Sequence, residues 1–217
     1  MADYSAIPLF PLQMVVFPDQ TVPLYIFEPR YRQMFADVRA AAERGEVLPV
    51  GVVLGQDSEV QADVGCTVVL QQVLTEYEDG RLEIVTQGAR RFRIDRLAET
   101  KSYLEAWVEY IDDEEEPTEP TLMARAQSGF KSLVEMAQEE SGVVADVGVP
   151  ETALEIAQAI ALDLAGRQRL LEITTENGRL RALCEHLDQL IPMLEKRHQL
   201  RRRVHSNGHS NGHSSAN

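Results

Sequence analysis

The chain has 217 residues and a formal net charge of −14, with 44% hydrophobic and 26% charged residues. This length allows a hydrophobic core in one large or two small domains. The acidic balance argues against nucleic-acid binders and against proteins of anionic membrane surfaces, because both need clustered Lys and Arg.

The sequence also lacks the marks of an exported or membrane protein. No apolar run approaches the roughly 20 residues that span a bilayer, and Asp3 and prolines stand where a secretory signal has a basic start. We therefore expect a cytoplasmic protein. Cys66 and Cys184 have no CxxC partner, so we expect neither a disulfide framework nor a zinc site, and no cofactor.

Prolines dominate the first segment, residues 7–35, which reads IPLFPLQMVVFPDQTVPLYIFEPRYRQMF. Proline lacks an amide hydrogen and is excluded from central sheet positions. The segment therefore predicts short, bent strands that lead into a helix. Pro29 opens that helix, which we expect over residues 29–44 with Gly45 as its stop signal.

Strand patterns follow this helix. Apolar or alternating runs cover residues 48–54, 64–78 and 103–111. Since strands dominate up to about residue 111, the first half predicts a small, mainly antiparallel β-barrel with one helix.

Asp79 and Gly80 give the strongest hairpin signal in the chain. They lie between two apparent strands in TEYEDGRLEIV. An Asp-Gly pair favours a type I′ turn, which needs positive φ at both central residues. Beyond it lie Arg90, Arg91 and Arg93, of which at least one is expected to be plain surface because strand residues alternate between faces.

An acidic linker is predicted at residues 112–120, DDEEEPTEP. Six carboxylates repel one another, and the two prolines prevent a helix from crossing the segment. We expect a solvated hinge here.

Helical periodicity begins after the linker. One helix is expected over residues 121–140, a second from Pro150, and a long third that Thr174 or Thr175 caps and that ends near Val204. These elements predict a C-terminal α-helical bundle.

An apolar stripe on the long helix allows a bundle seam or a dimeric coiled coil. The short repeat and Pro192, which we expect to kink the helix, favour core packing. The stripe consists of Leu180, Leu183, Cys184, Leu187, Leu190, Ile191 and Leu194.

The C-terminal tail, residues 205–217, is rich in Ser, Asn and Gly and is expected to be disordered. Its repeated histidines are not expected to form a functional metal site. The predicted division is thus a β-rich lobe at 1–111, a linker at 112–120, a helical lobe at 121–204 and this tail.

Three blocks of sequence resemble the Lon protease N-terminal domain family. They are the run FPL, VVFP and VPLYIFEPRYRQM near the start, residues 65–94 with their DGR hairpin and RRFR, and residues 153–187. The resemblance implies an α+β fold with a PUA-like pseudobarrel followed by a helical bundle. It also implies a module that recognises protein substrates or partners, which we expect to be a stand-alone member of the family without the ATPase and peptidase domains.

Catalytic motifs are missing from the chain. It contains no GxxxxGK[ST], HExxH or GxSxG motif, so we expect no ATPase or peptidase activity and no enzyme. Ser128 and Lys131 fit an SxxK pattern, but the SDN and KTG elements that accompany it are absent.

The candidate polypeptide-binding residues are Phe27, Glu28, Arg30 and Tyr31, an aromatic pair with opposed charges at the start of the first helix. The structural alternative is that Arg30 pairs with Glu28 and that Phe27 belongs to the core.

Three functions stay open at this point, together with the oligomeric state. A module that binds unfolded polypeptides is favoured, and an adaptor or assembly factor for one folded partner is the alternative. A small-molecule hydrolase comes third, because it needs a pocket with a perturbed nucleophile.

Overall fold

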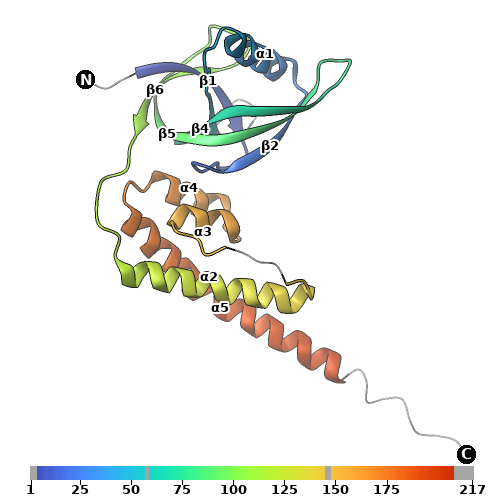
Figure 1. Cartoon of the computed structure of the whole chain (residues 1–217), viewed down its shortest axis with the longest axis vertical. Helices are drawn as coiled ribbons and strands as arrows, with labels where there is room; N and C mark the ends of the chain where they lie inside the picture. Colours follow the sequence, from blue (N-terminus) through green and yellow to red (C-terminus); the bar gives the residue numbers. More distant parts are fainter. Residues whose placement is uncertain (1–3, 57–58, 145–147, 208–217) are drawn as a thin grey trace, which may run out of the picture. The chain divides into compact units, whose positions relative to one another are not determined.

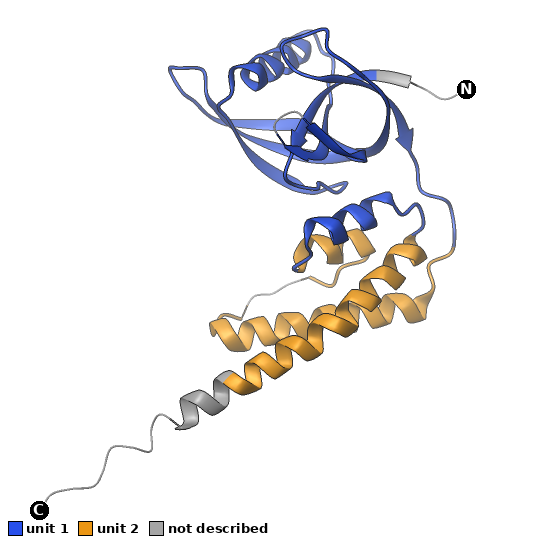
Figure 2. Ribbon diagram, turned by 180° about the vertical axis from the view of Figure 1, so that it is seen from behind, with its two compact units in different colours: residues 1–116, 161–175 blue, residues 117–160, 176–217 orange. Residues whose placement is uncertain are grey.

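The computed structural model describes residues 4–56, 59–144 and 148–207 (Figure 1). The chain divides into two compact units, coloured separately in Figure 2. The sheet unit comprises Met1–Glu116 and Ala161–Thr175, and the helical unit comprises Pro117–Ile160 and Glu176–Asn217.

Six strands form one mixed sheet in the order β2-β5-β4-β3-β1-β6, with a further pairing of β5 and β6. β1 and β3 run parallel, and the other paired strands run antiparallel. The strands are β1 (Tyr4–Leu12), β2 (Thr21–Ile26), β3 (Val50–Gln56), β4 (Glu59–Glu76), β5 (Leu82–Ala98) and β6 (Glu105–Ile111).

The core of the sheet unit lies where these strands approach closely. Phe92 on β5 is fully buried and packs in a cluster with Leu9 and Val108. A Cβ on Gly65 would lie 2.6 Å from the Phe92 ring and 2.4 Å from the Val52 carbonyl oxygen. A glycine is therefore required at this position so that the aromatic ring can lie against the backbone of β4.

The predicted hairpin joins β4 to β5, but the expected turn type was wrong. Gly80 has a φ of 82°, whereas Asp79 is not among the positive-φ residues, so the type I′ condition fails. The Gly80 N–H donates to the Tyr77 carbonyl at 2.9 Å, and the Tyr77 N–H donates to the Arg81 carbonyl at 3.0 Å. This is a three-residue loop with a left-handed glycine at its last position.

The helix α1 (Pro29–Glu43) matches its prediction closely. Pro29 occupies the first turn, and Gly45, with a φ of 77°, follows the end. The buried face of α1 consists of Tyr31, Met34, Phe35, Val38 and Ala41, spaced as a helix face requires.

Four more helices follow: α2 (Pro120–Ser141), α3 (Ala153–Ala159), α4 (Leu164–Glu172) and α5 (Glu176–Asn207). The helix expected from Pro150 begins later, at Ala153, so the predicted start was wrong. Thr152 is the N-cap of α3, and its hydroxyl accepts the Glu155 N–H at 3.2 Å. α4 was not predicted.

In the helical unit, α2 packs against α5. Leu180, Leu183 and Leu187 of α5 are buried. A Cβ on Gly129 of α2 would lie 2.9 Å from Leu187 Cδ1, so the small residue lets the two helices approach. The N-terminal part of the predicted stripe is therefore core, whereas the expected kink at Pro192 stays a prediction.

α4 belongs to the sheet unit, and a buried arginine on β5 holds its C-terminal end. Arg91 Nη1 donates to the carbonyl oxygens of Leu171 at 2.9 Å and Ile173 at 2.7 Å, and Nη2 bonds to Asp113. Only 4% of the Arg91 side chain is exposed. These bonds supply donors to carbonyls at the C-terminal end of the helix, where no following helical N–H is available.

Side chains of α4 also contact other parts of the sheet unit. Gln168 Nε2 donates to the Val64 carbonyl at 3.0 Å. The Arg167 guanidinium donates to the Val15 carbonyl and stacks on the Phe17 ring, 4.4 Å from its centroid. Side chains of α4 thus contact the chain at several points far apart in sequence.

The domain division made from the sequence stays a prediction. The first compact unit ends within the predicted linker and includes residues 161–175, which were assigned to the helical lobe. α5 continues to Asn207, and the remainder of the expected tail lies outside the described residues. Among the helices that the structure describes, none has the length and apolar character needed to cross a membrane.

Replacing Arg91 by Ala is expected to lower the free energy of unfolding of the sheet unit by about 3 kcal/mol, because the buried Leu171 carbonyl and the half-buried Ile173 carbonyl lose a donor. Urea denaturation measures the loss, and hydrogen exchange should show faster exchange in residues 164–172. Arg93→Ala is the matched control, because Arg93 is exposed on the same strand and should change stability by less than about 0.5 kcal/mol. Equal effects of the two substitutions would contradict the anchoring role of Arg91.

Candidate functional site

The four predicted contact residues lie at the corner between β2 and α1, and they differ in accessibility. Phe27 is 57% exposed, whereas Tyr31 is only 5% exposed and packs on Phe10 with ring centroids 4.2 Å apart. Phe27 is therefore surface, contrary to the core alternative, and Tyr31 is core. Direct contact of the four residues with a polypeptide stays a prediction.

Glu28 and Arg30 form the ion pair that the structural alternative expected. Arg30 Nη2 lies 2.7 Å from Glu28 Oε2, and the guanidinium lies 4.5 Å from the centroid of the Tyr31 ring. Both charged side chains are about one-third exposed. The pair thus covers Tyr31 and still presents charge at the surface beside Phe27.

Two tyrosines that the sequence reasoning missed extend the exposed aromatic surface. Tyr25 is 45% exposed and stacks with Phe27 at 5.9 Å between centroids and 29° between planes. Tyr77 meets Tyr25 edge to face at 6.3 Å. We call Tyr25, Phe27 and Tyr77 the aromatic platform.

Strand register explains why these rings gather. Tyr25 of β2 and Thr75 of β4 both pair with Glu83 of β5, so the three side chains share one face. The alternate residues Ile26 and Ile84 are buried on the opposite face. The signal in the sequence was the alternation of Tyr25 and Phe27 around buried Ile26, but Tyr77 joins them only through pairing across the sheet.

An arginine already lies on the platform. The Arg81 guanidinium is 5.0 Å from the Tyr77 centroid and 5.9 Å from that of Tyr25, and it donates to the Tyr25 hydroxyl. Asp79 Oδ2 holds Arg81 Nε at 2.7 Å. The backbone N–H of Arg81, followed by its side chain, holds the pKa of Asp79 below its usual value.

Glu83 fixes the third ring of the platform. Its Oε1 accepts the Tyr77 hydroxyl at 2.7 Å, and its Oε2 accepts the Thr75 hydroxyl at 3.1 Å. The hydrogen bond to the carboxylate raises the pKa of Tyr77, because it stabilises the neutral phenol. The platform is therefore held by side-chain hydrogen bonds as well as by the strands beneath it.

The platform borders an unpaired strand edge. In the described part of the chain β2 pairs with β5 alone. The Gly88 N–H donates to the Gln20 carbonyl at 2.8 Å, so the hydrogen-bonding alternation directs the backbone groups of Thr21, Pro23 and Tyr25 away from β5. Pro23 has no N–H, so a neighbouring strand cannot accept a hydrogen bond from it. At Tyr25, by contrast, the backbone offers both an N–H donor and a carbonyl acceptor.

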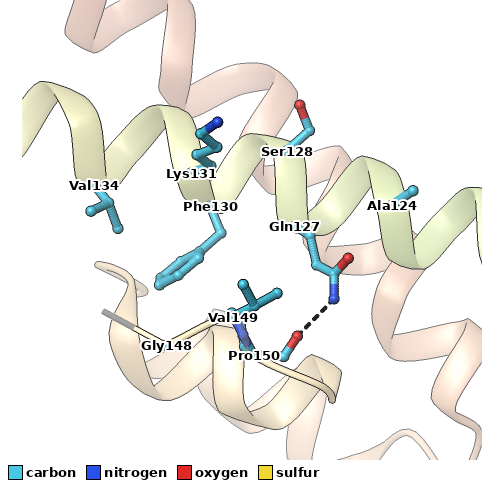
Figure 3. Close-up of a pocket in the computed structure, with 9 residues that line it drawn as sticks. All are labelled: Ala124, Gln127, Ser128, Phe130, Lys131, Val134, Gly148, Val149 and Pro150. Atoms are coloured by element: carbon cyan, nitrogen blue, oxygen red, sulfur yellow. Dashed lines mark hydrogen bonds between the residues drawn. The ribbon is translucent and has the colours of Figure 1, made fainter. Parts of the chain in front are cut away.

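A cavity of about 440 Å³ lies in the helical unit between α2 and residues 148–150 (Figure 3). Phe130 points toward Val149, and Gln127 Nε2 donates to the Pro150 carbonyl at 2.8 Å. Ser128 and Lys131 also line it, but they point away from Phe130 and Val149.

Ser128 and Lys131, the two residues of the SxxK pattern, are not paired with each other in the part of the chain that the structure describes. In the described residues no hydrogen bond joins Ser128 to Lys131, whose ammonium lies 3.8 Å from Glu135. The lining is mainly apolar, and no described residue forms a hydrogen bond with the Ser128 hydroxyl.

A protein-family model matches most of the chain. The model of the ATP-dependent protease La (LON) substrate-binding domain matches residues 6–189. A Lon protease 2 from Herpetosiphon aurantiacus is 27% identical over 91% of this chain, and a Lon protease from Xanthomonas oryzae is 29% identical over 92%. The chain spans about a quarter of the length of these relatives.

Solved structures show the same fold. A Lon N-terminal domain protein from Xanthomonas campestris superposes with a TM-score of 0.61 at 25% identity, covering 82% of this chain and 96% of that one. The N-terminal domain of a Mycobacterium avium complex Lon protease gives a TM-score of 0.60 at 20% identity, covering 86% of this chain and all of that one. The resemblance read from the sequence is confirmed.

Substitutions at the β2–α1 corner should separate core from surface. Tyr31→Ala is expected to lower the free energy of unfolding by about 3 kcal/mol, because it leaves a cavity against Phe10. Phe27→Ala should lower it by less than about 1 kcal/mol, since the ring is mostly exposed. Chemical denaturation of both variants measures the difference, and a large loss of stability in Phe27→Ala would place that ring in the core.

Proposed function

The chain belongs to the family of ATP-dependent protease La (LON) substrate-binding domains, and from this membership we propose that it binds unfolded polypeptide without altering it. The observation that carries the proposal is the aromatic platform beside the unpaired edge of β2. Exposed aromatic groups beside polar residues are typical of surfaces that bind other proteins.

The chemistry of the platform suits an unfolded segment. Folded proteins bury most of their aromatic and large aliphatic side chains, whereas unfolded chains expose them. The exposed faces of Tyr25 and Phe27 offer apolar contact at small cost in side-chain entropy, because each ring has only two χ angles. Such a surface accepts many sequences and discriminates chiefly by exposure.

The strand edge supplies a second kind of contact. An extended peptide that lies beside β2 meets the backbone N–H and carbonyl of Tyr25. Pairing of this kind reads no side chain, so it adds affinity without demanding a sequence. The Glu28–Arg30 pair lies next to the same corner and can contact polar groups of the bound segment.

The proposed role is non-catalytic. The relatives are named Lon proteases, and the family model that matches this chain is that of the LON substrate-binding domain. The sequence contains no GxxxxGK[ST] motif for nucleotide phosphates and no GxSxG motif. An adaptor for one folded partner is the alternative, and the binding experiment below separates the two.

We propose finer features of the architecture on the same basis. Strand pairing runs from β5 through β4, β3, β1 and β6 back to β5, which supports a small PUA-like barrel. The packing of α2 on α5 supports a helical bundle. A cytoplasmic location is proposed as well, supported by two free, buried cysteines, of which Cys66 has its pKa raised to about 12 by burial.

The proposal predicts saturable binding of a fluorescently labelled, permanently unfolded protein, measured by anisotropy without ATP. The native form of the same protein should not bind, because its apolar side chains are buried. Phe27→Ala should weaken binding about tenfold, and Arg30→Ala should weaken it by less, since each removes one contact at the corner.

Leu97→Ala is the matched control for these variants. Leu97 is 49% exposed on β5 of the same unit, and its loss should leave binding unchanged. Absence of binding up to high micromolar concentration would defeat the proposal and favour the adaptor. Equal binding of the native and unfolded forms of the labelled protein would also defeat the proposal.

A further inference from the structure

We propose that the aromatic platform selects basic, arginine-containing segments among unfolded polypeptides, an inference that rests on the proposed function and names its substrate class. Three independent observations carry it: the distribution of charge between the two units, the arginine already bound on the platform, and the free face of Phe27.

Charge is concentrated in the sheet unit. Its residues include 24 acidic and 12 basic side chains, so this unit carries −12 of the net charge of −14. The helical unit, with 11 acidic and 9 basic side chains, carries the remaining −2. The field of the sheet unit therefore attracts cationic segments and repels acidic ones.

The platform also shows how a guanidinium is held. Arg81 lies over two of its rings, donates to the Tyr25 hydroxyl and is paired with Asp79. This arrangement combines cation–π contact, hydrogen bonding to a phenol and a carboxylate partner, which are the interactions that an arginine of a bound segment would need.

One ring of the platform is free to take such a side chain. In the part of the chain that the structure describes, the cation–π contacts cover Tyr25 and Tyr77 but not Phe27, whose side chain is 57% exposed. Glu78 follows Tyr77 in the sequence, is exposed in the hairpin loop and has no ion-pair partner among the described residues. Phe27 thus offers a stacking face, and Glu78 offers an unneutralised carboxylate.

The occupant is therefore an extended segment with alternating arginine and aromatic or aliphatic residues. Its guanidinium stacks on Phe27, and its apolar side chains contact the edges of the neighbouring rings. Arginine is favoured over lysine, because the planar guanidinium stacks on a ring and is more weakly hydrated than an ammonium.

The test uses three labelled, unstructured peptides of equal length and equal phenylalanine content, in which the remaining variable positions are all Arg, all Ser or all Glu. Anisotropy should give affinities in the order Arg, Ser, Glu. At about 1 M salt, where the Debye length falls to about 3 Å, the three affinities should converge toward that of the Ser peptide.

Two substitutions locate the effect. Phe27→Leu retains an apolar side chain and removes the π face, so it should reduce the affinity of the Arg peptide about two- to fivefold more than that of the Ser peptide. Glu78→Gln should reduce the difference in affinity between the Arg peptide and the Glu peptide. Leu97→Ala should leave all three affinities unchanged, and circular dichroism confirms that each variant is folded.

The outcomes distinguish the proposed polypeptide-binding function from the preference for basic segments. If none of the peptides binds, the proposed function fails together with the inference. If all three bind equally at low salt, the polypeptide-binding function stands and the preference for basic segments is wrong. Equal losses for the Arg and Ser peptides in Phe27→Leu would likewise overturn the stacking of a guanidinium on that ring.

Discussion

The sheet unit depends on one long strand that is paired along both of its edges. β5 pairs with β2 through its first six residues, with β6 through its last eight, and with β4 along most of its length. Because consecutive side chains point to opposite faces, neighbours on β5 have different tasks. Phe92 fills the core against Gly65, while adjacent Arg91 reaches the end of α4.

The aromatic platform follows from the same strand. Glu83, near the start of β5, lies between Tyr25 on β2 and Thr75 on β4, and the hairpin that begins β5 brings Arg81 and Tyr77 beside them. Tyr25 lies on β2 and Tyr77 is fixed by its hydrogen bond to Glu83, so these two rings lose little further entropy when a ligand binds. The proposed binding surface therefore rests on β5, a strand that is paired along both of its edges.

The sequence predicted those elements whose signals are local. Pro29 and Gly45 marked the two ends of α1, and the Asp79-Gly80 pair marked the hairpin. The turn type was missed because dipeptide preference does not specify loop length, which here is set by the bond from the Tyr77 N–H to the Arg81 carbonyl. α4 was missed because its burial depends on Arg91 and Val64, about 80 and 100 positions earlier in the chain.

The same distinction applies to the candidate site. Phe27, Glu28 and Arg30 were found because they are neighbours in sequence, and the pairing of Glu28 with Arg30 follows from that proximity. Tyr77 and Arg81 lie about 50 residues from Tyr25 and reach it only through the register of β2 on β5. Aromatic type and charge are visible in a sequence, whereas their meeting on one face requires the pairing of strands to be known.

The bound Arg81 constrains how strong recognition at this surface can be. It already covers Tyr25 and Tyr77 and is tethered by Asp79, so a second cation can reach those rings only by displacing a partner whose effective concentration is high. Phe27 is left as the ring that a ligand can use without such competition. For the proposed function, one ring without a bound cation supports only modest affinity for an arginine side chain, and the affinity rises when several contacts act together.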